Sequence, residues 1–297
     1  MNQHEESELV NFGRRYSALR MVKSVIFNKI FYPIFRARAA ANHPQFVVFS
    51  SDLIGQGINL YGYWEHEELT ALSHWLKANN LTGGAMLDVG ANIGNHGVFL
   101  SEHYDTVHAV EPNPKTFAVL SLNAALVPNI QCHQIAASDS NGSVSFRQER
   151  TNVGHSRIVD GTSGQATTEV DCWKLDDYFP DVDNVRLVKI DVEGHEMSAI
   201  GGMQKILERC SPVVIFEQHL GGFVNGISPV IELLKKNGYT DFYSVDRIPS
   251  TQRGGRVGKL WFFLCSMLLG FRLVVRHRTT VEPAFYEMLI ARKGVAA

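Results

Sequence analysis

The sequence predicts an α/β protein built around a mostly parallel β-sheet with helices on both faces. From residue 85 onward, short apolar runs alternate with amphipathic segments, which is the pattern of strands alternating with helices. The first apolar run, 86–89, leads into a turn at 90–94 that has a glycine at each end, and an amphipathic helix pattern follows. Glycine permits tight turns and lets the backbone approach a ligand closely. This strand–turn–helix unit is typical of nucleotide-type binding, although the turn alone is a weak signal.

The alternation places the individual elements along the chain. We expect seven strands, and the sixth should run parallel to those before it, so that its end at 245 lies on the ligand-binding edge. The expected strands are 85–89, 106–111, 130–136, 186–191, 212–218, 239–245 and 284–291. The expected helices are 65–79, 95–103, 114–126, 196–208 and 227–237, with short strands or loops over 46–63, a hairpin at 142–148 and a polar loop at 150–167.

Two basic segments are attached to an acidic body. Residues 9–41 and residues 247–281 each hold seven Lys or Arg and no acid, which leaves 14 basic and 30 acidic residues elsewhere, a net charge of about −16. Within the first segment, 14–38 has the pattern of a basic amphipathic helix that should stop near Pro33. The chain therefore divides into an N-terminal extension, 1–45, and a domain, 46–297, that carries the basic hydrophobic insertion 247–281.

The insertion contains a run of twelve residues, 260–271, with one polar side chain. As a helix this run would span roughly 18 Å, too short for a hydrocarbon core of ~30 Å. It is a core helix, a dimer interface or an interfacial membrane anchor, and the flanking Lys and Arg favour an anchor on an anionic membrane. Because both basic segments are also rich in large apolar side chains, we expect no nucleic-acid binding. Homo-oligomerisation stays open.

The cysteines and the N-terminus bear on the compartment. The four cysteines are widely spaced and form no C-x-x-C pair, so neither a disulfide framework nor a zinc site is expected. The N-terminal residues are polar and acidic, unlike a secretory signal. We expect a cytoplasmic protein, with a peripheral position at the inner face of the membrane as one alternative.

In an open α/β sheet, ligands bind beyond the carboxyl ends of the strands. Glu111 ends the second strand about twenty residues after the glycine turn, where a carboxylate accepts both ribose hydroxyls of a nucleoside. Ser138 and Asp139 end the third strand, either within reach of an adenine edge or simply in a turn. The turn 90–94 lacks the second glycine of G-x-G-x-x-G, which disfavours a diphosphate ligand and hence a nucleotide-dependent dehydrogenase. A nucleoside without phosphates, such as S-adenosylmethionine, fits better.

Four stretches together resemble the FkbM-type methyltransferases: 88–94 (DVGANIG), 110–114 (VEPNP), 136–139 (AASD) and 189–196 (KIDVEGHE). The resemblance covers roughly 65–245 and the last strand. It implies a Rossmann-like class I methyltransferase fold that uses S-adenosylmethionine, usually to O-methylate sugars or natural products. The cofactor-binding residues that we expect on these motifs are Asp88, Gly90, Asn92, Gly94, Asn95, Glu111, Pro112, Ser138, Asp139 and Asp191.

Methyl transfer to a hydroxyl is an in-line displacement that depends on positioning and is helped by a general base. The candidates stand at the ends of the fourth and fifth strands: Asp191, Glu193, Glu217 and His219. We favour His219 as the base, whereas His195 is as well explained as a solvated residue at a helix start. The same four candidates could bind Mg²⁺, but no local spacing requires a metal and we predict none.

The loop 152–156 resembles the polar segment that covers the acceptor site in this family, and a plain surface loop explains it equally well. The sequence thus favours an O-methyltransferase acting on a glycan or natural-product hydroxyl, with a membrane-presented acceptor as one possibility. A nucleoside-binding or membrane-interaction module without catalysis is the alternative.

Overall fold

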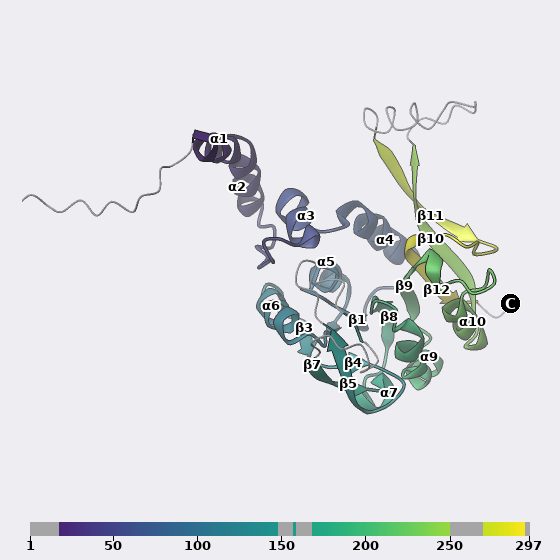
Figure 1. Cartoon of the computed structure of the whole chain (residues 1–297). Helices are drawn as coiled ribbons and strands as arrows, with labels where there is room; N and C mark the ends of the chain where they lie inside the picture. Colours follow the sequence, from purple (N-terminus) through teal and green to yellow (C-terminus); the bar gives the residue numbers. More distant parts are fainter. Residues whose placement is uncertain (1–17, 148–156, 159–167, 250–269, 295–297) are drawn as a thin grey trace, which may run out of the picture. The chain divides into compact units, whose positions relative to one another are not determined.

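The computed structural model describes residues 18–147, 157–158, 168–249 and 270–294 (Figure 1). The chain divides into two compact units, Met1–Pro44 and Gln45–Ala297, which are described separately.

The described part of the first unit is one helical stretch. It consists of α1 (Ala18–Ile26), a π-helical turn η1 (Phe27–Phe31) and α2 (Tyr32–Ala40). The prediction that the helix stops near Pro33 is wrong. Pro33 lies in the first turn of α2, where a helix tolerates a residue without a backbone N–H, and the wider π turn comes directly before it.

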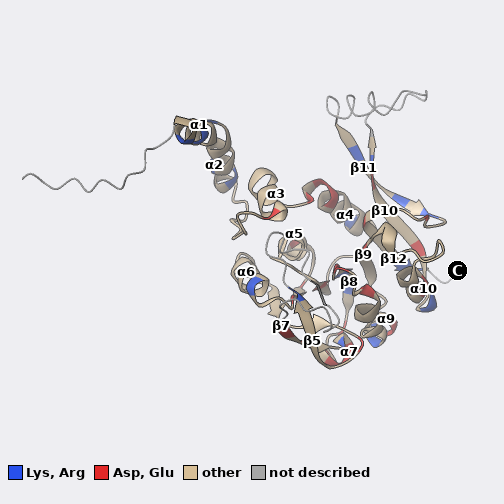
Figure 2. Ribbon diagram, viewed as in Figure 1, with Lys and Arg blue, Asp and Glu red and all other residues tan. Residues whose placement is uncertain are grey.

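This helical stretch exposes apolar and basic side chains together. Between residues 18 and 40 there are five Lys or Arg and no acidic residue, and Figure 2 marks the basic residues on these helices in blue. The exposed apolar residues are Leu19, Met21, Val22, Val25, Ile26, Phe27, Ile30, Tyr32 and Ile34. The amphipathic pattern expected from the sequence is therefore strong in α1, whereas α2 separates its apolar and polar side chains very little.

The second unit is built on an eight-stranded sheet with the strand order β11-β10-β12-β9-β8-β1-β2-β3. Five strands, from β9 to β3 in this order, are mutually parallel. β12 is antiparallel to β9 and β10 is antiparallel to β12, so β10 runs parallel to the first five, as expected. The strands are β1 (Ala85–Val89), β2 (Thr106–Val110), β3 (Ile130–His133), β8 (Val185–Ile190), β9 (Val213–Gln218), β10 (Tyr239–Pro249), β11 (Phe271–Arg278) and β12 (Tyr286–Lys293).

The eighth strand, β11, comes from the predicted insertion. It pairs antiparallel with β10 along the sheet edge, from Phe242↔Arg278 to Pro249↔Phe271. The expectation of seven strands therefore misses one, because the sequence pattern alone did not separate the end of the insertion from its apolar run. Most of that run, 260–269, lies outside the described residues.

Helices cover both faces of the sheet, as predicted. On β1, Leu87 and Val89 join a core cluster with residues of α8, α9 and α10, whereas Met86 joins a second cluster with residues of α4. This alternation is the period of two expected for a strand buried on both sides. The helices of this unit are α3 (Leu53–Tyr61), α4 (His66–Ala78), α5 (Asn95–Leu100), η2 (Ser101–His103), α6 (Pro114–Ala124), α7 (Leu175–Tyr178), α8 (Glu196–Gly201), α9 (Gln204–Cys210), η4 (Leu220–Gly222) and α10 (Pro229–Lys236).

Two of these helices begin at capping signals that the sequence carries. Asn113 accepts a hydrogen bond from the Lys115 backbone N–H (3.1 Å) and Pro114 follows it at the start of α6. Ser228 and Pro229 start α10 in the same way. The motif that ends β2 therefore also starts the next helix, which holds the β2 exit in place.

A smaller four-stranded sheet has the order β4-β7-β5-β6. Its strands are β4 (Ala136–Ala137), β5 (Gly142–Arg147), β6 (Arg157–Ile158) and β7 (Thr168–Trp173). The predicted strand 130–136 is thus divided between β3 in the large sheet and β4 in the small one. The predicted hairpin at 142–148 contains β5, which pairs antiparallel with β6 and β7.

Two further predictions differ from the structure at places where a glycine lets two segments pack closely. Residues 46–63 contain the helix α3, in which a Cβ on Gly57 would lie 2.5 Å from Cε3 of Trp64. The predicted helix 196–208 is broken into α8 and α9 at Gly202, where a Cβ would lie 1.9 Å from the carbonyl oxygen of Ser138. Sequence patterns do not show these long-range approaches.

Candidate active site

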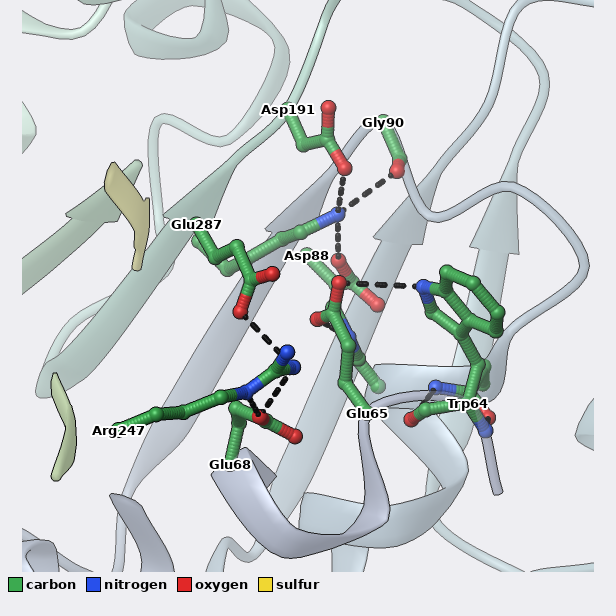
Figure 3. A network of polar contacts seen from close by, with 11 residues as sticks. Trp64, Glu65, Glu68, Asp88, Gly90, Asp191, Arg247 and Glu287 are labelled. Atoms are coloured by element: carbon green, nitrogen blue, oxygen red, sulfur yellow. Dashed lines mark hydrogen bonds and ion pairs between the residues drawn. The ribbon is translucent and has the colours of Figure 1, made fainter. Parts of the chain in front are cut away.

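The ammonium group of Lys189 joins the carboxyl ends of β1 and β8. Figure 3 draws its contacts with the labelled Gly90, Asp191 and Asp88 as dashed lines. Its Nζ donates to the carbonyl oxygen of Gly90 (3.0 Å) and to Oδ2 of Asp191 (3.2 Å), and it lies 3.6 Å from Oδ1 of Asp88. Burial by itself would lower the pKa of Lys189, but Asp191 and then Asp88 outweigh it and raise the pKa. Lys189 is therefore charged and holds the two strand ends together.

Asp88 is completely buried and lies next to the ammonium group of Lys189. Neither of its carboxylate oxygens has a hydrogen-bond partner among the described residues, so the ion pair with Lys189 is the compensation that the structure shows. Asp88 lines neither of the two cavities described next. Asp88, which we expected from the sequence to bind the cofactor, is therefore the charge partner of Lys189 and lies outside both cavities.

Two cavities lie at the carboxyl ends of the strands, and they share Asn92, Asp191 and Glu193. The first, which we call the nucleoside cavity, is lined among others by Gly90, Glu111, Pro112, Ala136, Ala137 and Phe146. The second, which we call the acceptor cavity, is lined among others by Trp64, Glu65, His96, Glu217, Phe285 and Glu287. A ligand in one cavity would therefore meet a ligand in the other beside Asp191.

Glu111 is the principal polar group of the nucleoside cavity. Its Oε2 accepts the backbone N–H of Asn92 (3.0 Å) and its Oε1 accepts that of Asn113 (2.9 Å). Burial raises the pKa of Glu111 to about 7, against the lowering effect of these two hydrogen bonds. Each oxygen keeps a further lone pair, so the carboxylate can accept one hydroxyl on each oxygen. This is the geometry expected for holding the two hydroxyls of a ribose.

The third strand end contributes its alanines and not the polar residues that follow them. Ala136 and Ala137 line the nucleoside cavity, whereas Ser138 and Asp139 do not. Ser138 is buried with its Oγ 3.2 Å from Nε2 of His195, and Asp139 is exposed. These two residues, expected from the sequence at the adenine edge, lie outside both cavities, and so does His195.

In the turn after β1, some residues line a cavity and others only hold the fold together. Gly90 lines the nucleoside cavity, and its φ of +80° and the 1.8 Å that would separate a Cβ from the carbonyl oxygen of Asp191 exclude other residues. Gly94 and Asn95 line neither cavity. The Asn95 side chain instead clamps the backbone of Trp64, accepting its N–H (2.9 Å) and donating to its carbonyl oxygen (3.0 Å). Asn95 thereby positions the segment that carries Trp64 and Glu65.

The acceptor cavity contains groups that the sequence motifs did not indicate. Glu65 accepts the indole N–H of Trp64 (3.1 Å), and its second oxygen lies 3.2 Å from Nε2 of His96. Burial opposes ionisation of Glu65, but the hydrogen bond and charge of His96 outweigh it, so the pKa of Glu65 is lowered. Glu287 reaches the same cavity from β12. Of these residues, only Glu65 has an unusual backbone conformation, the left-handed αL region. The sequence does not reveal this conformation.

Glu217 and His219 form a pair at the end of β9. Oε2 of Glu217 lies 3.3 Å from Nε2 of His219. Burial, followed by the charge of Asp191, raises the pKa of Glu217 to about 7, and His219 opposes this rise. Glu217 lines the acceptor cavity, but His219 is exposed and does not. The structure therefore makes Glu217 the better-placed base of the two, although the sequence analysis favoured His219.

Asp191 and Glu193 stand where the two cavities meet. Burial would raise the pKa of Asp191, but Lys189 and then His96 outweigh it and lower the pKa. Asp191 is thus an ionised group in the lining of both cavities. Within the residues described, no group of three or more His, Cys, Asp or Glu side chains is arranged to hold a metal ion. The loop 152–156 lies outside the described residues.

These donors and acceptors fit S-adenosylmethionine. Glu111 would hold its ribose, and the walls formed by Ala136, Ala137 and Phe146 are apolar enough for an adenine ring. The cationic methionine end would lie beside Asp191, where a carboxylate is ionised. The absence of a diphosphate-binding glycine agrees with a ligand that has no phosphates.

Replacing Lys189 by methionine should destabilise the fold severely. The variant leaves the buried Asp88 carboxylate without its cation, and breaking a buried pair costs about 3–5 kcal/mol of unfolding free energy. Chemical denaturation measures this loss. Lys77→Met is the matched control, because Lys77 pairs with Glu102 on the surface and should contribute no more than about 1 kcal/mol. Adding Asp88→Asn to Lys189→Met should restore part of the stability, and equal losses in the Lys189 and Lys77 variants would contradict this account.

Comparison with known proteins identifies the family to which this chain belongs. The family model "Methyltransferase FkbM domain" matches residues 88–240, half of the chain, from the β1 exit to the start of β10. The chain is similar to the hexuronic acid methyltransferase AglP of Haloferax volcanii, with 33% identity over 135 residues, which cover 45% of this chain and 55% of that protein. It is also similar to methyltransferase 1 of Beauveria bassiana, with 28% identity over 145 residues, 40% of this chain and 57% of that protein.

The chain thus spans about half the length of the curated relatives it matches. A solved structure, methyltransferase FkbM from Methylobacillus flagellatus KT, aligns over 65% of this chain and 49% of that chain with 17% sequence identity and a TM-score of 0.36. The matched range contains Gly90, Glu111, Asp191, Glu193 and Glu217, which line the two cavities. The chain belongs to the FkbM methyltransferase family.

Proposed function

We propose that this protein transfers a methyl group from S-adenosylmethionine to a hydroxyl of a sugar, a glycan or a similar natural product. The observation that carries the proposal is the meeting of the nucleoside cavity and the acceptor cavity at Asn92, Asp191 and Glu193. A methyl donor bound on Glu111 and an acceptor bound beside Glu217 would place the reacting atoms next to each other. The relative from Haloferax volcanii is named for a sugar acid, which supports a sugar as the acceptor class.

The chain's own residues would act mainly by positioning. S-adenosylmethionine supplies an electrophilic methyl group, and the transfer requires the acceptor oxygen to lie in line with it. Glu217 can take the proton of the acceptor hydroxyl, because its pKa of about 7 leaves it partly ionised at neutral pH. His219 orients Glu217 through their 3.3 Å contact and favours its ionised form.

The helical stretch of the N-terminal unit suggests that the protein finds its acceptor at a membrane surface. We propose that α1 and α2 bind an anionic membrane surface, because nine exposed apolar side chains are accompanied by five basic residues and no acidic residue between 18 and 40. The apolar side chains would enter the interface and the cations would meet the headgroups. In the insertion 247–281, Arg247, Arg276 and Arg278 form ion pairs with acidic residues of the fold, so we assign the attraction chiefly to α1 and α2. No helix in the part of the chain described is long and apolar enough to cross a membrane.

Replacing Glu111 by alanine should weaken the binding of S-adenosylhomocysteine. Two ribose hydroxyls lose their carboxylate acceptor, so at a pH above 7, where Glu111 is mainly ionised, the dissociation constant should rise roughly a hundredfold or more. Isothermal titration calorimetry measures it. Ser138→Ala is the control, since Ser138 lines neither cavity and its loss should change affinity little. Comparable effects of the two substitutions would contradict the assignment.

The rate of methyl transfer should fall as the pH is lowered through about 7. Protonation of Glu217 removes the base, and kcat with saccharide acceptors and labelled methyl donor measures the loss. Glu217→Gln should lower kcat roughly a hundredfold or more and abolish this limb of the profile. His219→Gln should keep the limb but move it to higher pH, because His219 lowers the pKa of Glu217. Because the pKa of Glu111 is also raised to about 7, the profile is measured at saturating S-adenosylmethionine, and a limb that then survives in Glu217→Gln would assign the base elsewhere.

Liposome flotation tests the membrane proposal. The protein should float with vesicles containing anionic lipid and much less with neutral vesicles. The double variant Val22→Asp/Ile26→Asp, on the exposed surface of α1, should lose binding. Leu122→Asp, an equally exposed apolar residue on α6, is the control. Equal flotation of all three proteins, or none, would reject the proposal, and loss of a dimer in the Val22/Ile26 variant by light scattering would show that this surface binds a second copy instead.

A further inference from the structure

The acceptor cavity is unusually rich in carboxylates. Five of its lining residues are acidic, and they come from separate parts of the fold. The five are Glu65 before α4, Asp191 and Glu193 after β8, Glu217 in β9 and Glu287 in β12. The basic residues of the same lining are Lys189 and the imidazole of His96. A ligand in this cavity would therefore meet more carboxyl groups than basic groups.

Two cations among the described residues reach these carboxylates, and each is shared with a carboxylate outside the lining, so the carboxyl groups of this part of the chain outnumber its cations. Lys189 is shared between Asp191 and the buried Asp88, as Figure 3 shows. Arg247 is likewise shared, because its guanidinium contacts Glu68 (Nε–Oε1, 2.6 Å) and Glu287 (3.2 Å). Each of these two cations thus faces two carboxylates, one of them buried outside the cavity lining.

The titration of two lining residues reflects the same surplus. Besides burial, the charges of Asp191, Glu193 and Glu65 raise the pKa of Glu217. Burial raises the pKa of Glu287, and Glu65 and Glu68 add to this against the opposing charge of Arg247. Both carboxyl groups are thus harder to ionise in the presence of their neighbours. A further anion brought into the cavity would meet the same repulsion.

We infer that the acceptor cavity selects an uncharged, hydroxyl-rich sugar and rejects an acceptor that carries a carboxylate. The inference rests on the proposed function and names its acceptor class. Sugar hydroxyls can donate hydrogen bonds to the lining carboxylates. The carboxylate of a sugar acid would instead need hydrogen-bond donors in the lining. The indole N–H of Trp64 is one such donor, but it already bonds Glu65. The rings of Trp64 and Phe285 in the lining supply apolar surface for the C–H face of a pyranose. This chain would then differ from the Haloferax relative, which is named for a hexuronic acid.

Paired glycosides test the selectivity. The p-nitrophenyl glucoside and galactoside are compared with the corresponding glucuronide and galacturonide, so that only a hydroxymethyl group is exchanged for a carboxylate. With labelled S-adenosylmethionine, kcat/KM should be at least roughly tenfold higher for the neutral member of a pair that is methylated. The double variant Glu65→Gln/Glu287→Gln should narrow this ratio. Glu67→Gln, on the exposed side of α4, is the matched control and should leave it unchanged. A uronide used as well as or better than its neutral partner would overturn the inference.

Fluorescence quenching of Trp64 measures the charge of the cavity without any turnover. The contribution of Trp64 is the difference between the wild type and Trp64→Phe. Caesium should quench it more strongly than iodide, and Glu65→Gln/Glu287→Gln should reduce this difference. Iodide quenching equal to or stronger than caesium quenching would overturn the inference. If caesium is preferred but no glycoside is methylated, the result contradicts sugar methylation and upholds the exclusion of anions.

Discussion

The interaction on which the site depends is the contact of one buried ammonium group with two strand ends. Lys189 bonds the Gly90 carbonyl oxygen and Asp191, and it neutralises Asp88 beneath them. Because Gly90 and Asp191 line the nucleoside cavity, any shift of Lys189 would move the wall against which a cofactor binds. The required glycine at 90 has the same origin, since the Asp191 carbonyl oxygen lies where a Cβ would be. Electrostatics and close backbone packing therefore act on the same few atoms.

Around this contact the structure separates two kinds of carboxylate. Asp191 is kept ionised by a buried cation, whereas Glu111 and Glu217, each with a pKa raised to about 7 chiefly by burial, sit on either side of it. Such a separation of pKa values lets one acid bind while another exchanges a proton. It also leaves the acceptor cavity with more negative than positive groups, which ties the proposed chemistry of the site to the proposed choice of its substrate.

Local sequence alone indicated several of the residues that line the two cavities. Glu111 follows a strand and a glycine turn at a characteristic spacing, and the structure puts it in the nucleoside cavity. Asp191, Glu193 and Glu217 also follow buried strands and line the acceptor cavity. The predictions for Ser138, Asp139 and Asn95 placed them in the right segments, but the way these segments pack was not visible. None of the three lines either cavity.

The sequence by itself determined the alternation of strands and helices, the mostly parallel character of the sheet and the strand ends that carry carboxylates, because these follow from hydrophobic period and turn residues within short stretches. Only the tertiary structure decided which groups face one ligand. Glu65 enters from the segment before α4 and Glu287 from the last strand, more than two hundred residues apart. Their proximity to Lys189 and Glu217 arises from burial of apolar strand and helix faces, which brings distant segments together without leaving a local pattern in the chain.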